Sequence, residues 1–202
     1  ISLDHGVIVD FTMNKVCAAG TGSFLEEQAE KLGVDIVGEF GETALRSEKP
    51  ADLGERCTVF METQLNHLMQ QGVPKDRLIA GLSYSIVSNY LNKVVEFRRV
   101  GEKIFFQGGV AANKGVKAAF DRVTGKKVTV PPHHDVLGAV GAAIIAQRRL
   151  PEGPSRFKGF DLRAMKYQVE SFECTDCPNH CEINRVLIEG EEPLYYGSRC
   201  GK

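Results

Sequence analysis

One stretch of the sequence, residues 103–148, alternates strand and helix patterns and so restricts the class of fold. Lys103–Gln107 is a short, mostly apolar run that leads into a glycine pair, and Lys126–Val130 is a second run that two prolines stop. The first run has the appearance of a buried strand, and the second is predicted to be another strand. Helical patterns follow them, over Lys114–Val123 and His134–Arg148. Because strands separated by helices pair through parallel crossovers, we predict an α/β layer architecture.

The residues before this stretch read as a hairpin followed by helices. Ile1–Leu3 and Gly6–Phe11 are apolar runs on either side of a turn, which predicts a β-hairpin. Pro74 at a first helical position opens the longest helix. We predict helices over about Ser23–Leu32, more weakly over Ile36–Leu45, over about Cys57–Gln70, and from Pro74 to about Val100. The last of these carries apolar side chains at helical spacing: Leu78, Leu82, Ile86, Tyr90, Val94 and Phe97.

A change in composition divides the 202 residues into two parts. Leu150–Ser155 has the proline and glycine content of a linker, and the chain beyond it is polar, aromatic and rich in cysteine. We predict an α/β unit over residues 1–150 and a small extension over residues 151–202. The extension is too short for a core of its own, so we expect a metal to stabilise it.

Charge and hydropathy exclude several classes of function. The chain has 25 basic and 26 acidic residues, so no basic field indicates binding to nucleic acid or to an anionic membrane. The longest apolar run, Val136–Ala146, is too short to span a bilayer. No signal peptide is visible, and six cysteines in such a chain favour metal or redox chemistry over disulfides. We therefore expect a cytoplasmic protein, and the missing initiator methionine indicates a piece of a longer one.

Cys17 lies in a small, glycine-rich turn just before an amphipathic helix. Ser23 is placed to cap that helix, and Glu26 completes a capping box. A thiolate in such a turn meets unpaired backbone N–H groups and the positive end of the helix dipole, which lower a thiol's pKa. Gly20–Gly22 could also cradle a phosphate, but we favour a role in shaping the turn.

Cys57 lies at a second predicted helix start, in Gly54–Glu62. Two cysteines cannot fill the four positions of an iron–sulfur cluster, whereas two from each chain of a symmetric dimer can. The alternative is that Cys17 and Cys57 are buried structural thiols, because free cysteine packs well in a core.

The segment Gly108–Asn113 follows a predicted strand and precedes a predicted helix. Its glycines would allow a flat ligand or a phosphate to approach the backbone closely. A glycine pair after a strand is common, however, and Asn113 is equally suited to cap the helix.

The extension contains four cysteines, Cys174, Cys177, Cys181 and Cys200, on hairpin-like segments around Glu182–Ile188 and Leu194–Tyr196. This spacing is typical of a structural zinc knuckle, and four thiolates also suit a second iron–sulfur cluster. The third interpretation is that the four cysteines are incidental free thiols. We favour zinc over the iron–sulfur cluster. We interpret His180 as an exposed loop residue.

The remaining polar clusters favour structural roles. His133, His134 and Asp135 lie at a helix start, where the carboxylate supports the dipole and the histidines are expected to be exposed. Glu26 and Glu27 read as helix-start charges and not as paired catalytic carboxylates.

The segments Asn14–Glu30, Arg56–Glu62 and Gln107–Asn113 together resemble the ATP-dependent activators of 2-hydroxyacyl-CoA dehydratases and benzoyl-CoA reductases. Those activators belong to the acetate-kinase, sugar-kinase, chaperone and actin superfamily of ATPases, whose domains are ribonuclease-H-like. The resemblance covers roughly the first three quarters of the chain. The extension resembles that of longer, multi-domain activase-like proteins.

The resemblance implies a homodimer that holds one [4Fe–4S] cluster between its subunits, ligated by Cys17 and Cys57 of each chain. It implies ATP or ADP with magnesium, with the adenosine contacted by Gly108, Gly109, Val110 and Asn113. Gln107 is a less certain member of that pocket. The electron donor would be reduced ferredoxin or flavodoxin, and the acceptor would be a CoA-ester dehydratase or reductase of anaerobic metabolism.

The match is to the second half of the actin-like domain only. The phosphate-binding loops and the catalytic acid of the superfamily lie in the preceding half, so we do not expect this chain alone to hydrolyse ATP. Two rival functions remain. A small-molecule kinase of the same superfamily would use the glycine pocket but not Cys17 and Cys57, and a non-enzymatic module would use only zinc in the extension.

Overall fold

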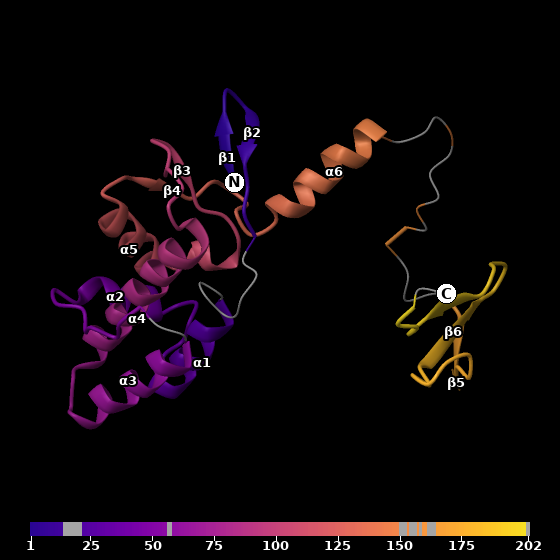
Figure 1. Ribbon diagram of the computed structural model, residues 1–202, viewed down its shortest axis with the longest axis horizontal. Coiled ribbons are helices and arrows are strands. Elements are labelled where there is room, and N and C mark those ends of the chain that lie inside the picture. Colours follow the sequence, from indigo (N-terminus) through magenta and orange to yellow (C-terminus); the bar gives the residue numbers. More distant parts are fainter. Residues whose placement is uncertain are drawn as a thin grey trace. The chain divides into compact units, whose positions relative to one another are not determined.

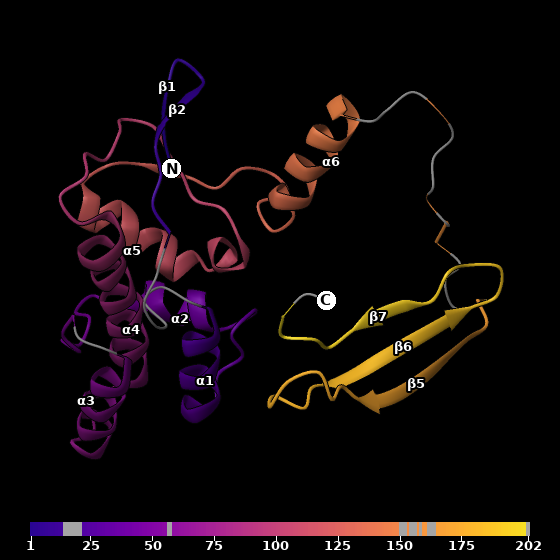
Figure 2. The same ribbon diagram turned by 45° about the vertical axis from the view of Figure 1, so that its right-hand side comes forward.

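The chain forms two compact units, Ile1–Leu150 and Pro151–Lys202, called the N-terminal and C-terminal units below. The structure is a computed structural model that describes residues 1–13, 22–55, 58–149, 153, 157, 159–160 and 165–200. Figure 1 and Figure 2 show the N-terminal unit as a group of helices with two small sheets, and the C-terminal unit as a sheet alone.

The helices of the N-terminal unit fall close to the predicted segments. They are α1 (Gly22–Leu32), α2 (Phe40–Arg46), α3 (Thr58–Gln70), α4 (Lys75–Tyr90), a π-helical turn (Leu91–Val95), a 3₁₀ turn (Gly109–Ala112), α5 (Lys114–Thr124) and α6 (Leu137–Arg149). The strands are β1 (Ser2–Asp4), β2 (Val7–Asp10), β3 (Ile104–Phe105) and β4 (Val128–Thr129).

Helix α4 forms the centre of the core. Ten of its sixteen residues are buried, and α1, α2, α3 and α5 pack around it. In both views α4 lies between α5 and α3 (Figures 1 and 2). The largest fully buried apolar side chains come from four different helices: Leu25, Phe40, Met61, Leu65, Ile79, Leu82 and Ile86. Burial of this apolar surface is the main contribution to the stability of the unit.

The predicted parallel crossover is confirmed. β3 pairs with β4 in parallel, with Ile104 opposite Val128, and α5 makes the connection. The prediction of a buried strand over Lys103–Gln107 is only partly right, because β3 is two residues long and Phe105 is exposed. Among the described residues no third strand joins this pair. Of the four residues of β3 and β4, only Val128 is buried.

The hairpin prediction is also confirmed, since β1 and β2 pair antiparallel with Asp4 opposite Val7. Helix α1 begins one residue earlier than predicted, at Gly22, so Ser23 lies inside the first turn and not before it. Gly33 ends α1 with φ +63°, the left-handed conformation that glycine adopts most readily.

The long helix predicted to reach about Val100 ends earlier, at Tyr90. A single π-helical turn follows, in which the N–H of Glu96 donates to the carbonyl of Leu91 at 2.7 Å. Glu96 then turns the chain at φ +55°, and Phe97 is left exposed. The apolar spacing continues past this point, but a π-turn shifts the register of the helix and moves later residues off the buried face.

No residue of α6 is buried, although its glycines and alanines are small residues that permit close packing between helices. A Cβ added at Gly138 or Gly141 would meet open space, with no neighbouring side chain or backbone within 4 Å. None of the described helices is both long enough and apolar enough to cross a membrane.

The C-terminal unit is a three-stranded antiparallel sheet in the order β5 (Tyr167–Glu173), β6 (Glu182–Ile188), β7 (Leu194–Tyr196). β6 and β7 coincide with the two predicted hairpin segments, whereas β5 was not predicted. Ile183 is the one buried apolar side chain among its described residues.

Candidate functional site

The segment Gly108–Asn113 is a sharply turned connection that only glycine permits at its first position. Gly108 has φ +94° and ψ 176°, a combination that residues with a Cβ almost never adopt. Phe106 fixes the chain just before this turn, because its N–H donates to the carbonyl of Thr129 on β4 at 2.9 Å. The N–H of Ala111 then donates to Gly108 O at 3.1 Å and closes the 3₁₀ turn.

His134 holds this turn in place through two hydrogen bonds. The N–H of Gly108 donates to the carbonyl of His134 at 2.7 Å. In return, Nδ1 of His134 lies 2.9 Å from Gly108 O, and because a carbonyl only accepts, Nδ1 is the donor. Sequence reasoning treated His134 as exposed and missed this contact. A histidine just before a helix carries no signal for a partner 26 residues away.

Asn113 caps helix α5, as one of the two sequence readings proposed. Its Oδ1 accepts the N–H of Gly115 at 3.0 Å and that of Val116 at 3.1 Å. These bonds satisfy two of the donors that a helix start leaves open. Its Nδ2 atom is buried and has no hydrogen-bond partner among the described residues, so the bonds that cap the helix use only the oxygen of this side chain.

The start of α1 contacts the same turn. A Cβ added at Gly22 would lie 3.3 Å from Cγ2 of Val110, so the helix that follows the Cys17 turn touches the glycine segment directly. Residues 14–21 and 56–57, which include Cys17, Gly20 and Cys57, lie outside the described part of the chain. The two predicted cluster ligands therefore have no described position. The helices that follow them are described.

The beginning of α2 packs against the beginning of α5. A Cβ at Gly41 would lie 3.1 Å from the backbone nitrogen of Lys114. Lys114 Nζ lies 2.6 Å from Glu42 Oε1, and this hydrogen bond lowers the pKa of Glu42 and raises that of Lys114. The pair is exposed, so it orients the two helices without adding much stability.

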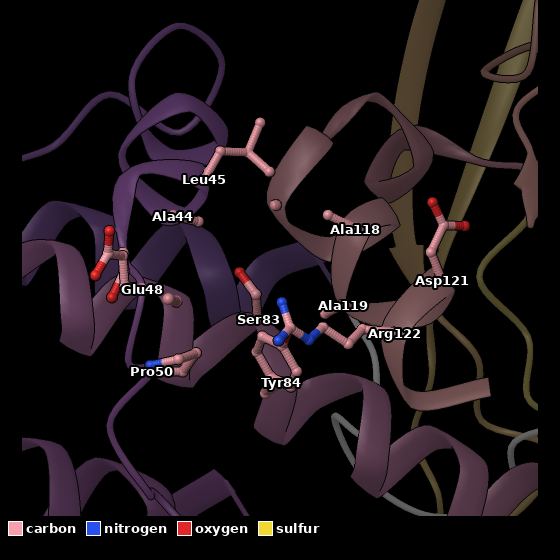
Figure 3. Close-up of a pocket in the computed structure, with 13 residues that line it drawn as sticks. Ala44, Leu45, Glu48, Pro50, Ser83, Tyr84, Ala118, Ala119, Asp121 and Arg122 are labelled. Carbon is pink, nitrogen blue, oxygen red and sulfur yellow. The ribbon is translucent and has the colours of Figure 1, made fainter. Parts of the chain in front are cut away.

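A cleft of about 530 Å³ lies between α2, α4 and α5 (Figure 3). Ser83, Tyr84 and Arg122 point into it, whereas Asp121 turns away (Figure 3). Asp121 accepts the backbone N–H of Val128 at 2.7 Å and a bond from Lys117 at 2.6 Å. Gly115 lines the cleft, but Gly108, Gly109, Val110 and Asn113 do not. The cleft and the glycine turn are therefore separate regions that share the first turn of α5.

The four cysteines of the extension are free thiols at one end of the sheet. Cys174, Cys177 and Cys181 are half-buried and Cys200 is exposed. The N–H of Cys174 donates to the carbonyl of Cys181 at 2.8 Å. His180 is exposed, as predicted, and its Nδ1 lies 2.6 Å from Glu173 Oε1. Within the described ranges no three His, Cys, Asp or Glu side chains converge closely enough to hold a metal ion.

The N-terminal unit matches a known family over almost its whole length. Residues 1–146 match the BadF/BadG/BcrA/BcrD ATPase family. The chain belongs to this family. The (R)-2-hydroxyglutaryl-CoA dehydratase activating ATPase of Acidaminococcus fermentans is 34% identical over 151 residues, which are 74% of this chain and 56% of that protein. The chain thus spans about half the length of this curated relative.

Two solved structures of family members have the same fold as this chain. The crystal structure of A. fermentans (R)-2-hydroxyglutaryl-CoA dehydratase component A superposes with a TM-score of 0.68 at 32% identity, covering 74% of this chain and 57% of that one. The activator of 2-hydroxyisocaproyl-CoA dehydratase from Clostridium difficile, solved with bound ADPNP, gives 0.62 at 28% identity, covering 74% and 58%. The predicted family and its actin-like ATPase fold are therefore confirmed.

The family match ends at residue 146, so it does not include the extension and its four cysteines. The glycine turn, the cap Asn113 and both helix starts that follow Cys17 and Cys57 lie inside it.

Proposed function

We propose that this chain is part of an ATP-dependent reductive activator, which delivers one low-potential electron to a CoA-ester dehydratase or reductase. The observation that carries the proposal is the match to activating ATPases over residues 1–146, which includes both cysteine segments and the glycine turn. A small-molecule kinase of the same superfamily would have no use for Cys17 and Cys57.

Cys17 and Cys57 of two chains would hold a [4Fe–4S] cluster on a two-fold axis. When bound, that cluster would supply the electron. The described first turns of α1 and α3 contain no acidic residue, which fits an anionic group at these helix starts. Glu26, interpreted from the sequence as a helix-start charge, and Glu62 each follow the first turn. Cys57 directly precedes Thr58, the first residue of α3. Both thiols would bind as thiolates after losing their protons.

Gly108, Gly109, Val110 and Asn113 would contact the adenosine of ATP or ADP. Gly108 turns the backbone at φ +94°, and hydrogen bonds of His134 and Asn113 fix the two ends of the turn. The buried Nδ2 of Asn113, which has no partner among the residues that the structure describes, is a further hydrogen-bond donor near this turn. A relative solved with bound ADPNP supports nucleotide binding.

The contact of Gly22 with Val110 offers a route by which nucleotide binding would affect the cluster. Val110 lies in the proposed adenosine segment, and Gly22 begins the helix that follows Cys17. A shift of the turn on nucleotide binding would therefore press directly on α1. We expect the electron donor to be reduced ferredoxin or flavodoxin.

The decisive experiment is anaerobic reconstitution of the full chain with iron and sulfide. We expect a brown protein with four irons per dimer and an electron-resonance signal after reduction. Cys17→Ser and Cys57→Ser should each abolish both, because the remaining thiols cannot complete the ligand set.

Cys177→Ser is the matched control, since it removes a thiol from the extension and should leave the signal unchanged. A reconstituted protein without iron, or iron retained in the Cys17→Ser and Cys57→Ser double variant after Cys177→Ser is added to it, would rule out the proposed ligands.

A further inference from the structure

We propose that the C-terminal unit binds a structural zinc ion at one end of its sheet, through the thiolates of Cys174, Cys177, Cys181 and Cys200. This site lies outside the family match and does not depend on the activator function. Four thiols would each release a proton on binding, giving the tetrahedral four-cysteine site that structural zinc prefers.

The pairing of β5 with β6 brings the first and third cysteines together. Glu173 lies opposite Glu182, and the next pair outward is Cys174 and Cys181, joined by the 2.8 Å backbone hydrogen bond. Opposed residues in antiparallel strands have Cβ atoms about 4.5–5.5 Å apart. Two thiolates on one tetrahedral zinc lie about 3.8 Å apart, given Zn–S bonds of about 2.3 Å. This pair therefore reaches a shared ion without moving the strands.

Cys177 lies in the loop that connects these two residues. The N–H of His180 donates to the carbonyl of Cys177 at 3.3 Å, which turns the loop back toward the sheet. The spacing of two residues after Cys174 is the spacing at which one loop supplies two zinc ligands. Because the three thiols do not converge in the free chain, metal binding would bring Cys177 to the ion by a rearrangement of this loop.

Cys200 reaches the same end of the sheet from the third strand. β7 pairs with β6, with Tyr196 opposite Asn184, and Gly197 continues along β6. A Cβ at Gly197 would overlap the carbonyl oxygen of Glu182, so the two backbones run in direct contact there. Cys200 follows three residues later, and three residues span at most about 10 Å. The pairing of β7 with β6 therefore leads the chain before Cys200 toward the end of the sheet where Cys174 and Cys181 lie.

The C-terminal unit also lacks a hydrophobic core, so a bound metal ion would contribute to its stability. Its described residues bury one apolar side chain, Ile183, while large apolar residues on β5 and β7 are exposed. A sheet of this size without a core is marginally stable in water. The thiols do not converge as free side chains, so the ion itself would draw the loop and the end of the chain together. Small domains commonly obtain their stability from a metal in this way.

The test is metal analysis of the full chain purified with zinc. We expect one zinc ion per chain, and we expect cobalt substitution to give the strong visible bands of a tetrahedral thiolate site. Cys177→Ser and Cys200→Ser should each lower the zinc content at least tenfold after dialysis. A second measurement guards against misfolding of either variant. In the native sequence, zinc should slow hydrogen exchange at the amides of residues 174–181.

Two controls separate this proposal from the cluster. Cys17→Ser should lose cluster iron and keep zinc, and His180→Asn should keep zinc, because His180 is occupied by Glu173 and Asn tolerates its positive φ. A chain that takes up no zinc would overturn the proposal. Iron and sulfide retained in the Cys17→Ser and Cys57→Ser double variant would overturn the choice of metal, and zinc retained in both Cys177→Ser and Cys200→Ser would overturn the ligand set.

Discussion

At the scale of single residues, the backbone of Gly108 decides the shape of the candidate nucleotide segment. Its φ and ψ lie in a region open to glycine alone, and its N–H and carbonyl are both bonded to His134. Gly109, one residue later, has ordinary backbone angles and open space around it. Substitution of Gly108 by alanine therefore tests backbone strain, and the same substitution at Gly109 tests contact with a ligand.

We expect Gly108→Ala to destabilise the protein by about 1–3 kcal/mol, because alanine is strained at φ +94°. Gly109→Ala should leave stability nearly unchanged but weaken ATP and ADP binding, since its methyl group would occupy the space proposed for adenosine. Urea denaturation and calorimetric titration with ADP would measure the two effects in the full-length protein. Equal ADP affinity in Gly109→Ala and the native sequence would contradict the proposed contact.

At the scale of elements, Asp121 joins helix α5 to strand β4. It accepts the N–H of the buried Val128 and a bond from Lys117 on its own helix. Partial burial works against ionisation, but the bonds from Lys117 and Val128 prevail and lower the pKa of Asp121 below its ordinary 3.8. Glu102 is a useful comparison, because Lys126 also lowers its pKa although its carboxylate is exposed.

Because the pKa of Asp121 is lower in the folded state, its contribution is fully present above pH 3.8 and is lost as the pH falls through the folded value. We expect Asp121→Asn to lower the free energy of unfolding by about 1 kcal/mol at pH 7. The difference from the native sequence should shrink in acid. Urea denaturation between pH 7 and pH 3 measures this.

Glu102→Gln is the control, and it should have a smaller effect at every pH because water screens its ion pair. A difference between Asp121→Asn and the native protein that stays constant down to pH 3 would show that the carboxylate charge does not act there.

At the scale of the whole molecule, the proposed cluster is shared between two chains, so assembly and cluster binding are linked. We expect oxidation and chelation of the reconstituted protein to convert dimers into monomers, as measured by analytical ultracentrifugation under anaerobic conditions. Cys57→Ser should be monomeric from the start. A dimer that persists without iron would show that the protein surface alone holds the chains together.

Local patterns in the sequence predicted much of the fold. The order of elements, the glycine that ends α1 and the cap at Asn113 follow from neighbouring residues, because capping and turn formation act over a few positions. The parallel pairing of β3 with β4 is the one contact between distant segments that the order of elements itself predicted. The family resemblance rested on short motifs of the same kind.

Other contacts between distant segments could not be predicted in this way. The bond from His134 to Gly108, the approach of Gly22 to Val110 and the meeting of Cys174, Cys181 and the end of β7 each join residues far apart in the chain. Burial was also misjudged, since Phe105 and helix α6 have buried-type sequences but lie exposed. Neighbouring residues thus specify which helices, turns and caps form. Which of these elements meet, and which apolar faces are covered, emerges only in the folded chain, because those outcomes depend on partners that no local pattern contains.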